Sequence, residues 1–136
     1  MLKYSHYKRV RYSETDKMGY LYYGHYAMYY EIGRTESLRA FGMSYKQMED
    51  EEGVMLPVVS LESRYLAPAY YDDNIEIVTI LKEMPEKMIT FHHELKNSEG
   101  KILNRAKIKL FYIDMKTGAR RSIPDSLRKI FTPHFT

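Results

Sequence analysis

The amino-acid sequence predicts a single α+β domain in which one long helix packs against an antiparallel sheet that curls around it. Apolar residues recur at helical spacing between about residues 25 and 41, and the pattern changes to a period of two after Gly53. The chain has 136 residues, of which 44% are hydrophobic, so it can build one core and has little room for a second. We therefore expect one domain over residues 1–136.

The first third of the chain predicts a strand, a polar loop and the long helix. Residues 4–13 mix tyrosine, valine and basic side chains in a strand-like way, and residues 13–19 are polar turn formers that end in a glycine. The helix is expected from about His25 to Phe41, with charged residues interspersed among the apolar ones. Gly42 is a natural end for it, because glycine accepts the left-handed conformation found there.

Short strands dominate the rest of the sequence. Ser44 and Gln47 have the spacing of a capping box and predict a short acidic helix through Glu52. Alternating apolar and polar residues then predict four consecutive strands, over residues 59–65, 75–80, 89–95 and 102–113. Turn-forming residues separate these strands, and Pro124 with Asp125 opens a short C-terminal helix.

A small domain with long strands leaves a sheet edge whose backbone groups are unpaired. Pairing that edge with a second copy of the chain is a common solution, so we expect a homodimer or homotetramer. No apolar run reaches the length that spans a bilayer, and the N-terminal residues do not resemble a secretory signal. We expect a cytoplasmic protein that does not insert into membranes.

Composition excludes several kinds of chemistry. The sequence contains no cysteine, which excludes disulfides, zinc–cysteine sites and thiol nucleophiles. The net charge of +3 is mild and suits many proteins, including those that bind phosphate groups. Fourteen tyrosines are the unusual feature, because six of them fall within residues 20–30.

Common catalytic and binding motifs are absent. There is no G-x-S-x-G, and the glycine pair at Gly19 and Gly24 lacks the lysine of a phosphate-binding loop. His92 and His93 are neighbours on a predicted strand, so they point to opposite faces and cannot share a metal. The segment Lys107-Ile-Lys-Leu-Phe-Tyr-Ile113 is faintly similar to an RNA-binding strand, but it lacks the glycines of that motif. We expect no metal site and no nucleic-acid partner.

The strongest functional signal is the arrangement around Asp16. An aspartate in a polar loop is most often a turn former, and a tyrosine cluster is most often core or interface. However, Asp16-Lys-Met-Gly-Tyr-Leu-Tyr-Tyr-Gly-His-Tyr26 followed by Tyr30-Glu-Ile-Gly-Arg-Thr-Glu36 resembles the signature of hotdog-fold acyl-CoA thioesterases. The similarity is greatest to the 4-hydroxybenzoyl-CoA thioesterases and the Tol–Pal-associated acyl-CoA thioesterases. It continues through Tyr65-Leu-Ala-Pro-Ala69 to the end of the long last strand.

This resemblance implies a role for several positions. Asp16 matches the catalytic carboxylate, which attacks the thioester or activates a water, and the Tyr23 amide matches the helix-start donor that polarises the thioester carbonyl. The remaining matches are substrate-binding positions, in which two glycines allow close approach of the backbone and the other side chains shape the acyl pocket. These positions are Gly19, Tyr22, Gly24, Tyr26 and Glu31.

Two departures from the family pattern concern the helix-start donor and the binding of the CoA phosphates. Some relatives have histidine where Tyr23 stands, which leaves the backbone donor as the expected contribution of this position. The arginine pair that binds the CoA phosphates in the hydroxybenzoyl enzymes is replaced by Pro85-Glu86, so Lys87 is the remaining candidate for CoA binding. CoA is expected as part of the substrate, and no other cofactor is expected.

The resemblance thus predicts hydrolysis of a short-chain or aryl acyl-CoA to the free acid and CoA. The first alternative hypothesis is an acyl-carrier-protein thioesterase or a hotdog dehydratase that uses His25. The second is a non-catalytic protein that binds acyl ligands or RNA.

Overall fold

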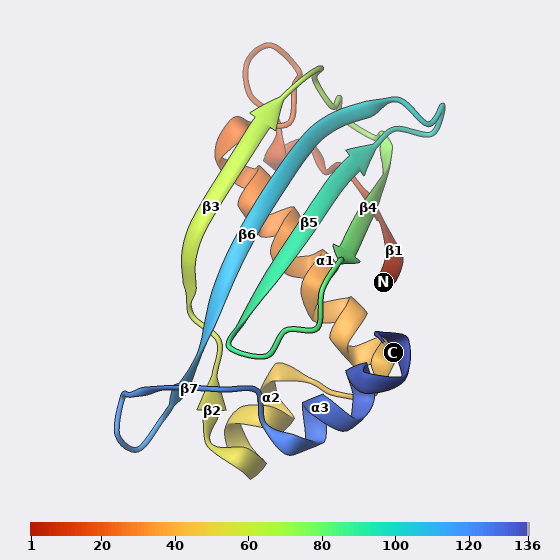
Figure 1. The fold of residues 1–136 in the computed structure, drawn as a ribbon. Coiled ribbons are helices and arrows are strands. Elements are labelled where there is room, and N and C mark those ends of the chain that lie inside the picture. The colour runs from red at the N-terminus through yellow and green to blue at the C-terminus, as the bar shows by residue number, and fades with distance from the viewer. Residues whose placement is uncertain (136) are drawn as a thin grey trace.

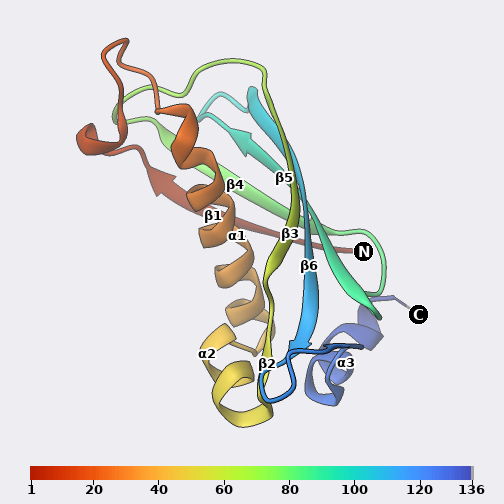
Figure 2. The same ribbon diagram turned by 90° about the vertical axis from the view of Figure 1, so that its left-hand side faces the viewer.

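A curved antiparallel sheet holds the central helix α1 (Tyr26–Phe41) against one of its faces in the computed structural model, which describes residues 1–135 (Figure 1). The strands follow the order β1-β4-β5-β6-β3, and the short strands β2 and β7 pair with the far end of β6. Figure 2 shows how the sheet bends around α1. The main strands are β1 (Leu2–Arg9), β3 (Val58–Tyr65), β4 (Asn74–Leu81), β5 (Met88–Lys96) and β6 (Ile102–Asp114), while β2 is Val54–Met55 and β7 is Arg120–Arg121.

The core lies between α1 and the concave face of the sheet. On β5, Ile89, Phe91, His93 and Leu95 are buried while the residues that alternate with them are half-buried, as an alternating strand with one face on the core requires. Tyr29 and Tyr30 on α1 are both 0% exposed. The burial of these large side chains on both layers is the main stabilising contribution.

Two glycines explain where α1 lies and where it ends. A Cβ at Gly33 would sit 2.6 Å from Ile77 Cγ2 on β4, so the bare glycine is what permits the close approach of helix and sheet. Gly42 adopts a left-handed φ of 108° and caps the helix, as the sequence predicts.

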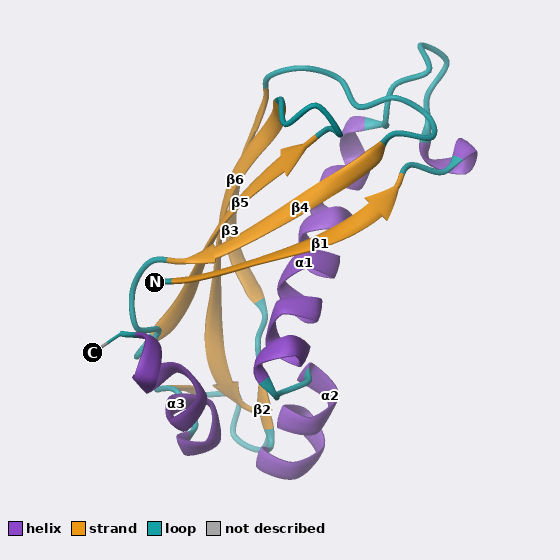
Figure 3. Ribbon diagram, turned by 90° about the vertical axis from the view of Figure 1, so that its right-hand side faces the viewer, coloured by secondary structure: helices purple, strands orange, loops and turns teal. Residues whose placement is uncertain are grey.

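Smaller elements close the lower end of the molecule in Figure 1. The predicted capping residue Ser44 accepts a hydrogen bond from the Gln47 amide at 3.0 Å and starts α2 (Tyr45–Gln47), which continues as the π-helical segment η3 (Met48–Glu52). The C-terminal helix α3 (Asp125–Phe131) is followed by the 3₁₀ turn η4 (Thr132–His134). Figure 3 shows α2 and α3 at the same end of the molecule, below the sheet.

The predicted α+β class, the long helix and the four consecutive strands are confirmed. One boundary differs, because the first strand ends at Arg9 and does not continue to residue 13. The chain leaves the sheet there, Val10 donates its amide to the Asp73 carbonyl at 2.9 Å, and the 3₁₀ turn η1 (Tyr12–Glu14) follows. Among residues 1–135, no helix is both long and apolar enough to cross a bilayer.

Strand β3 forms one edge of the main sheet, since among residues 1–135 it pairs only with β6. Val58, Val59 and Leu61 on this strand are 44–45% exposed, although the sequence pattern alone would place two of them on a buried face. The sheet therefore presents an apolar strand with unpaired backbone groups to its surroundings.

Candidate active site

Asp16 sits at the tip of a small loop that its own carboxylate helps to shape. Its Oδ1 accepts hydrogen bonds from the Met18 amide at 2.9 Å and from the Tyr20 amide at 3.2 Å. The backbone closes the same turn, because the Asp16 amide donates to the Tyr20 carbonyl at 2.9 Å. Gly19 takes a φ of 79°, which favours glycine at this point of the turn. Within residues 1–135, the second carboxylate oxygen of Asp16 accepts no hydrogen bond and is available for chemistry.

The helix that begins next to this loop supplies amide donors. The 3₁₀ turn η2 (Tyr23–His25) leads directly into α1, so Tyr23 and Gly24 occupy the first turn of a continuous helical segment. Across the described chain, the amides of Tyr23 and Gly24 donate no hydrogen bond, as is usual for the start of a helix. A first-turn amide that is free in this way, at the positive end of the helix dipole, favours an oxygen that gains negative charge.

Asp16 and Tyr23 line one hollow of about 360 Å³ at the upper end of α1 in Figure 1. Apolar and aromatic side chains form most of its wall, and Asp16 is the only ionisable carboxylate among its lining residues. The wall comes from the Asp16 loop, the start of the helix, and the segment that follows β3. Its residues are Asp16, Met18, Tyr20, Leu21, Tyr23, Tyr26, Tyr65, Leu66, Ala67 and Pro68.

Tyrosines from three elements hold this hollow together. The Tyr65 hydroxyl donates to the Tyr23 carbonyl at 3.0 Å, and its ring lies edge-on to the Tyr26 ring with centroids 4.9 Å apart. Burial raises the pKa of the Tyr26 phenol and outweighs the hydrogen bond with the Ala69 backbone, which lowers it, so this hydroxyl is neutral at physiological pH. Tyr65 is a site residue that the sequence pattern did not predict, although the Tyr65–Ala69 segment carries part of the family resemblance.

Three further predicted positions surround the hollow without forming its wall. Gly19 shapes the Asp16 turn, and Tyr22 packs its ring against Tyr23 with centroids 4.7 Å apart. A Cβ at Gly24 would lie 2.7 Å from Tyr22 Cε2, so Gly24 makes room for the Tyr22 ring. Packing against Tyr22 therefore explains why a glycine occupies position 24, whereas the predicted contact of Gly24 with substrate stays a prediction.

Glu31 and Lys87 lie apart from the hollow within one chain. Glu31 is exposed on α1, about two turns beyond Tyr23, and it does not line the hollow. Lys87 belongs to the β4–β5 connection at the opposite end of the sheet from the Asp16 loop (Figure 1). A single chain therefore does not place either residue in the hollow with Asp16, and their predicted roles stay predictions.

Two other hollows, of about 450 and 460 Å³, lie on the convex side of the sheet and are lined by polar and charged residues that include Lys82, His92 and Lys107. Unlike the hollow at Asp16, neither is lined by a residue from the start of a helix, so neither combines a carboxylate with a free helix-start amide. His93, in contrast, is buried on the concave side and stacks on Tyr30 with ring centroids 4.7 Å apart. The two adjacent histidines thus face opposite sides, as predicted, and no group of residues within 1–135 is arranged to hold a metal ion.

Known proteins that are similar to this chain belong to one class of enzyme, the thioesterases. The family model of the thioesterase-like superfamily matches residues 10–131. The acyl-CoA thioester hydrolase YbgC of Escherichia coli is 33% identical over 119 residues, which cover 88% of each chain. A 1,4-dihydroxy-2-naphthoyl-CoA hydrolase of Microcystis aeruginosa is 25% identical over 119 residues, covering 87% of this chain and 84% of the relative.

The fold has close counterparts among solved structures. The DHNA-CoA thioesterase of Staphylococcus aureus superposes with a TM-score of 0.90 over 98% of this chain and 91% of that one, at 24% identity. At that identity the likeness concerns the fold alone. Together with the site described above, these matches define a hotdog-fold protein of the thioesterase class. The chain belongs to the thioesterase-like superfamily, which confirms the family predicted from the sequence.

Proposed function

We propose that this protein hydrolyses acyl-CoA thioesters in the hollow between the Asp16 loop and the start of the helix. The observation that carries the proposal is that Asp16, with an unpaired carboxylate oxygen, and Tyr23, with a free amide, both line the same apolar hollow. The E. coli relative at 33% identity is named as an acyl-CoA thioester hydrolase, which supports the same activity here.

The geometry supports a division of roles between the two groups. The thioester carbonyl oxygen would accept the Tyr23 N–H, which stabilises the negative charge that develops when the carbonyl carbon is attacked. The free oxygen of Asp16 would either attack that carbon or take a proton from a water that does. In both routes one water is consumed, the carbon–sulfur bond breaks, and the products are the free acid and the CoA thiol.

The hollow favours a short-chain or aryl acyl group. Its volume of about 360 Å³ and its wall of tyrosine, leucine and proline side chains suit a compact, apolar or aromatic acyl group. The naphthoyl-CoA relative at 25% identity supports the aryl option. An acyl-carrier protein could present the same thioester, so a panel should compare acetyl-, butyryl- and benzoyl-CoA with matching acyl-carrier-protein thioesters, read out as free thiol.

The rival dehydratase reading depends on His25. This side chain is half-buried, lies edge-on to Tyr22 with ring centroids 5.6 Å apart, and does not line the hollow. This position outside the hollow favours the thioesterase over the dehydratase. Loss of activity in His25→Ala together with full activity in Asp16→Asn would favour the dehydratase.

Asp16→Asn is the decisive variant for the proposed function. Asparagine keeps an oxygen that can accept from the Met18 and Tyr20 amides, so the loop should hold its shape. Loss of the negative charge should lower kcat by about 10²- to 10⁴-fold, the usual contribution of a general base. Hydrolysis of a good acyl-CoA substrate at the wild-type rate would refute the role of Asp16. If the wild type hydrolyses none of the panel but binds oligonucleotides in a salt-dependent way, the protein is an RNA binder.

The active form is proposed to be a homodimer or larger homo-oligomer in the cytoplasm. The exposed apolar residues of β3 and the unpaired edge of that strand support pairing with a second chain. Such pairing would place a partner next to the end of β3 and the residue that follows it, where Tyr65 and Leu66 line the hollow. Analytical ultracentrifugation should give at least twice the chain mass of 16.2 kDa, and a monomer at micromolar concentration would contradict the proposal.

A further inference from the structure

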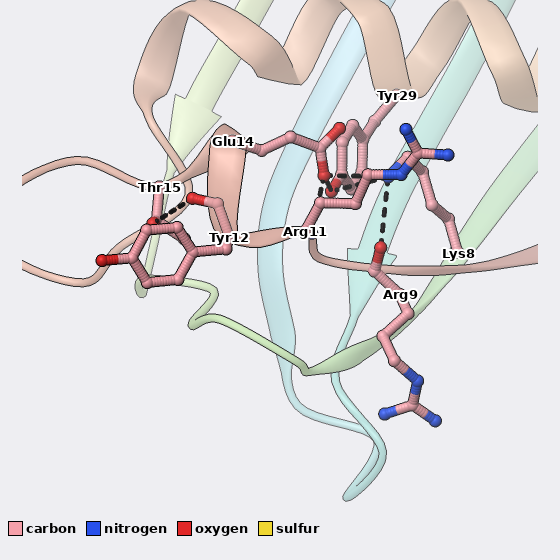
Figure 4. A network of polar contacts seen from close by, with 7 residues as sticks. All are labelled: Lys8, Arg9, Arg11, Tyr12, Glu14, Thr15 and Tyr29. Carbon is pink, nitrogen blue, oxygen red and sulfur yellow. Dashed lines mark hydrogen bonds and ion pairs between the residues drawn. The ribbon is translucent and has the colours of Figure 1, made fainter.

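A buried carboxylate lies two residues before Asp16, outside the hollow. Glu14 is 7% exposed, and a single oxygen, Oε1, receives three donors. These are the Lys8 ammonium at 2.8 Å, the Arg11 amide at 2.9 Å and the Tyr29 hydroxyl at 2.7 Å (Figure 4). Burial raises the pKa of Glu14, but the hydrogen bonds from Lys8, Arg11 and Tyr29 outweigh it, so the pKa lies below its usual value and the group is charged.

The three donors come from different parts of the fold. Lys8 belongs to β1, Arg11 to the segment after that strand, and Tyr29 to α1. The Lys8 ammonium also lies 4.6 Å from the centre of the Tyr29 ring. Glu14 therefore ties the loop that precedes Asp16 to the sheet edge and to the central helix at the same time.

The backbone of Glu14 continues this connection toward the active site. Its carbonyl accepts the Tyr22 amide at 2.9 Å, and the next amide along the chain is the free donor of Tyr23. Thr15 and Leu21 then form a bridge that closes the hairpin with Asp16 near its tip. Asp16, which carries the carboxylate, and Tyr23, which carries the oxyanion donor, thus lie on the two arms of one hairpin. The base of this hairpin is held at Glu14.

We propose that Glu14 is a positioning residue, which fixes the Asp16 carboxylate relative to the Tyr23 amide by anchoring the hairpin to Tyr29 of the central helix. This inference rests on the proposed function for its kinetic consequence. The anchor itself is a structural property that can be measured without any substrate.

Tyr29→Phe is the mildest test, because it removes one hydroxyl and keeps the buried ring. The hairpin should become more mobile, and hydrogen exchange of the amides in residues 14–22 should be severalfold faster, with exchange in β5 and β6 unchanged. Misplacement of a catalytic group by about 1 Å can cost up to about 100-fold, so we expect kcat to fall about 10- to 100-fold while KM stays the same.

Tyr112→Phe is the matched control. Tyr112 is also 0% exposed, and its hydroxyl also donates one buried hydrogen bond, to the Pro85 carbonyl at 2.7 Å near the other end of the sheet. Both variants should show similar losses in melting temperature, but Tyr112→Phe should keep wild-type kcat and wild-type exchange in residues 14–22. Equal falls of kcat in the two variants would show general destabilisation and overturn the positioning role.

Variants of Glu14 itself give a graded second test. Glutamine can still accept from Tyr29 and the Arg11 amide but cannot pair with the Lys8 charge, whereas alanine loses every contact. We expect kcat to fall in the order wild type, Glu14→Gln, Glu14→Ala. If Tyr29→Phe leaves hairpin exchange unchanged, the anchor is wrong whatever the kinetics show. If exchange rises but Asp16→Asn is fully active, the anchor holds and the proposed function fails.

Discussion

The contact between Gly33 of α1 and strand β4 allows a stability change to be worked out from the structure. In Gly33→Ala the new Cβ would lie 2.6 Å from Ile77 Cγ2 and 2.8 Å from Thr79 Oγ1. The first distance is about 1 Å closer than the roughly 3.5–4.0 Å at which carbon atoms attract. Ile77 is 0% and Thr79 is 3% exposed, so neither side chain can turn into solvent to relieve the overlap.

Two effects of opposite sign decide the result. Alanine is favoured over glycine inside a helix by about 1 kcal/mol. Inserting a methyl group into a closely packed core costs about 1–3 kcal/mol. Because both neighbours are buried, we take the upper half of that range and expect a net destabilisation of about 1–2 kcal/mol, or a melting temperature lower by about 3–8 °C.

Urea unfolding followed by circular dichroism measures this free energy directly. The overlap also predicts that the effects of Gly33→Ala and of a substitution at Ile77 on the free energy of unfolding are not additive. Ile77→Ala removes Cγ2, so the double variant should be more stable than the sum of the two single losses would give. If Gly33→Ala alone were about 1 kcal/mol more stable than the wild type, helix propensity would dominate and the close-approach argument would be refuted.

Two other predictions concern Gly24 and His93. Gly24→Ala brings a Cβ to 2.7 Å from Tyr22, but the Tyr22 side chain is 41% exposed and can swing aside, so unfolding should change by less than about 0.5 kcal/mol in the same urea assay. A loss as large as that of Gly33→Ala would contradict this. Burial, and then the charge of Arg34, lowers the pKa of His93 to about 3, so the unfolded chain binds a proton below pH 6.5 that the folded chain does not. Stability should therefore fall by up to about 1.4 kcal/mol per pH unit as the pH drops from 6.5 toward 3, and His93→Phe should flatten that fall in urea titrations at several pH values. An unchanged slope in the variant would exclude His93 as its source.

Sequence analysis predicts most of the fold because the periodic elements have clear local causes. The helix cap at Gly42, the capping box at Ser44 and the alternation along β5 each depend on residues close together in the chain. The end of β1 depends on a contact made 63 residues away, where Val10 meets Asp73, and no local pattern signals it.

The site is predicted only in part for the same reason. Asp16 and Tyr23 lie seven residues apart, so a family motif can contain both. Tyr65 reaches Tyr23 from the end of β3, across a separation that only the folded sheet closes. In the sequence, Glu14 looks like an ordinary polar loop residue. Its anchoring role is not predicted because its three donors are also brought together by the tertiary structure. Lys87 lies in the β4–β5 connection, at the opposite end of the sheet from the Asp16 loop, and its predicted contact with CoA stays a prediction.

The tyrosine-rich segment shows how a single sequence feature can have several physical origins. Tyr29 and Tyr30 are fully buried and belong to the core, where Tyr29 also holds Glu14. Tyr26 is buried as well, yet it lines the hollow, whereas Tyr23 is 65% exposed and contributes its backbone amide to the site. Core, anchor and active site therefore occupy about two turns of one continuous helical segment. A change that shifts this helix for reasons of packing, such as Gly33→Ala, should consequently alter catalysis as well as stability.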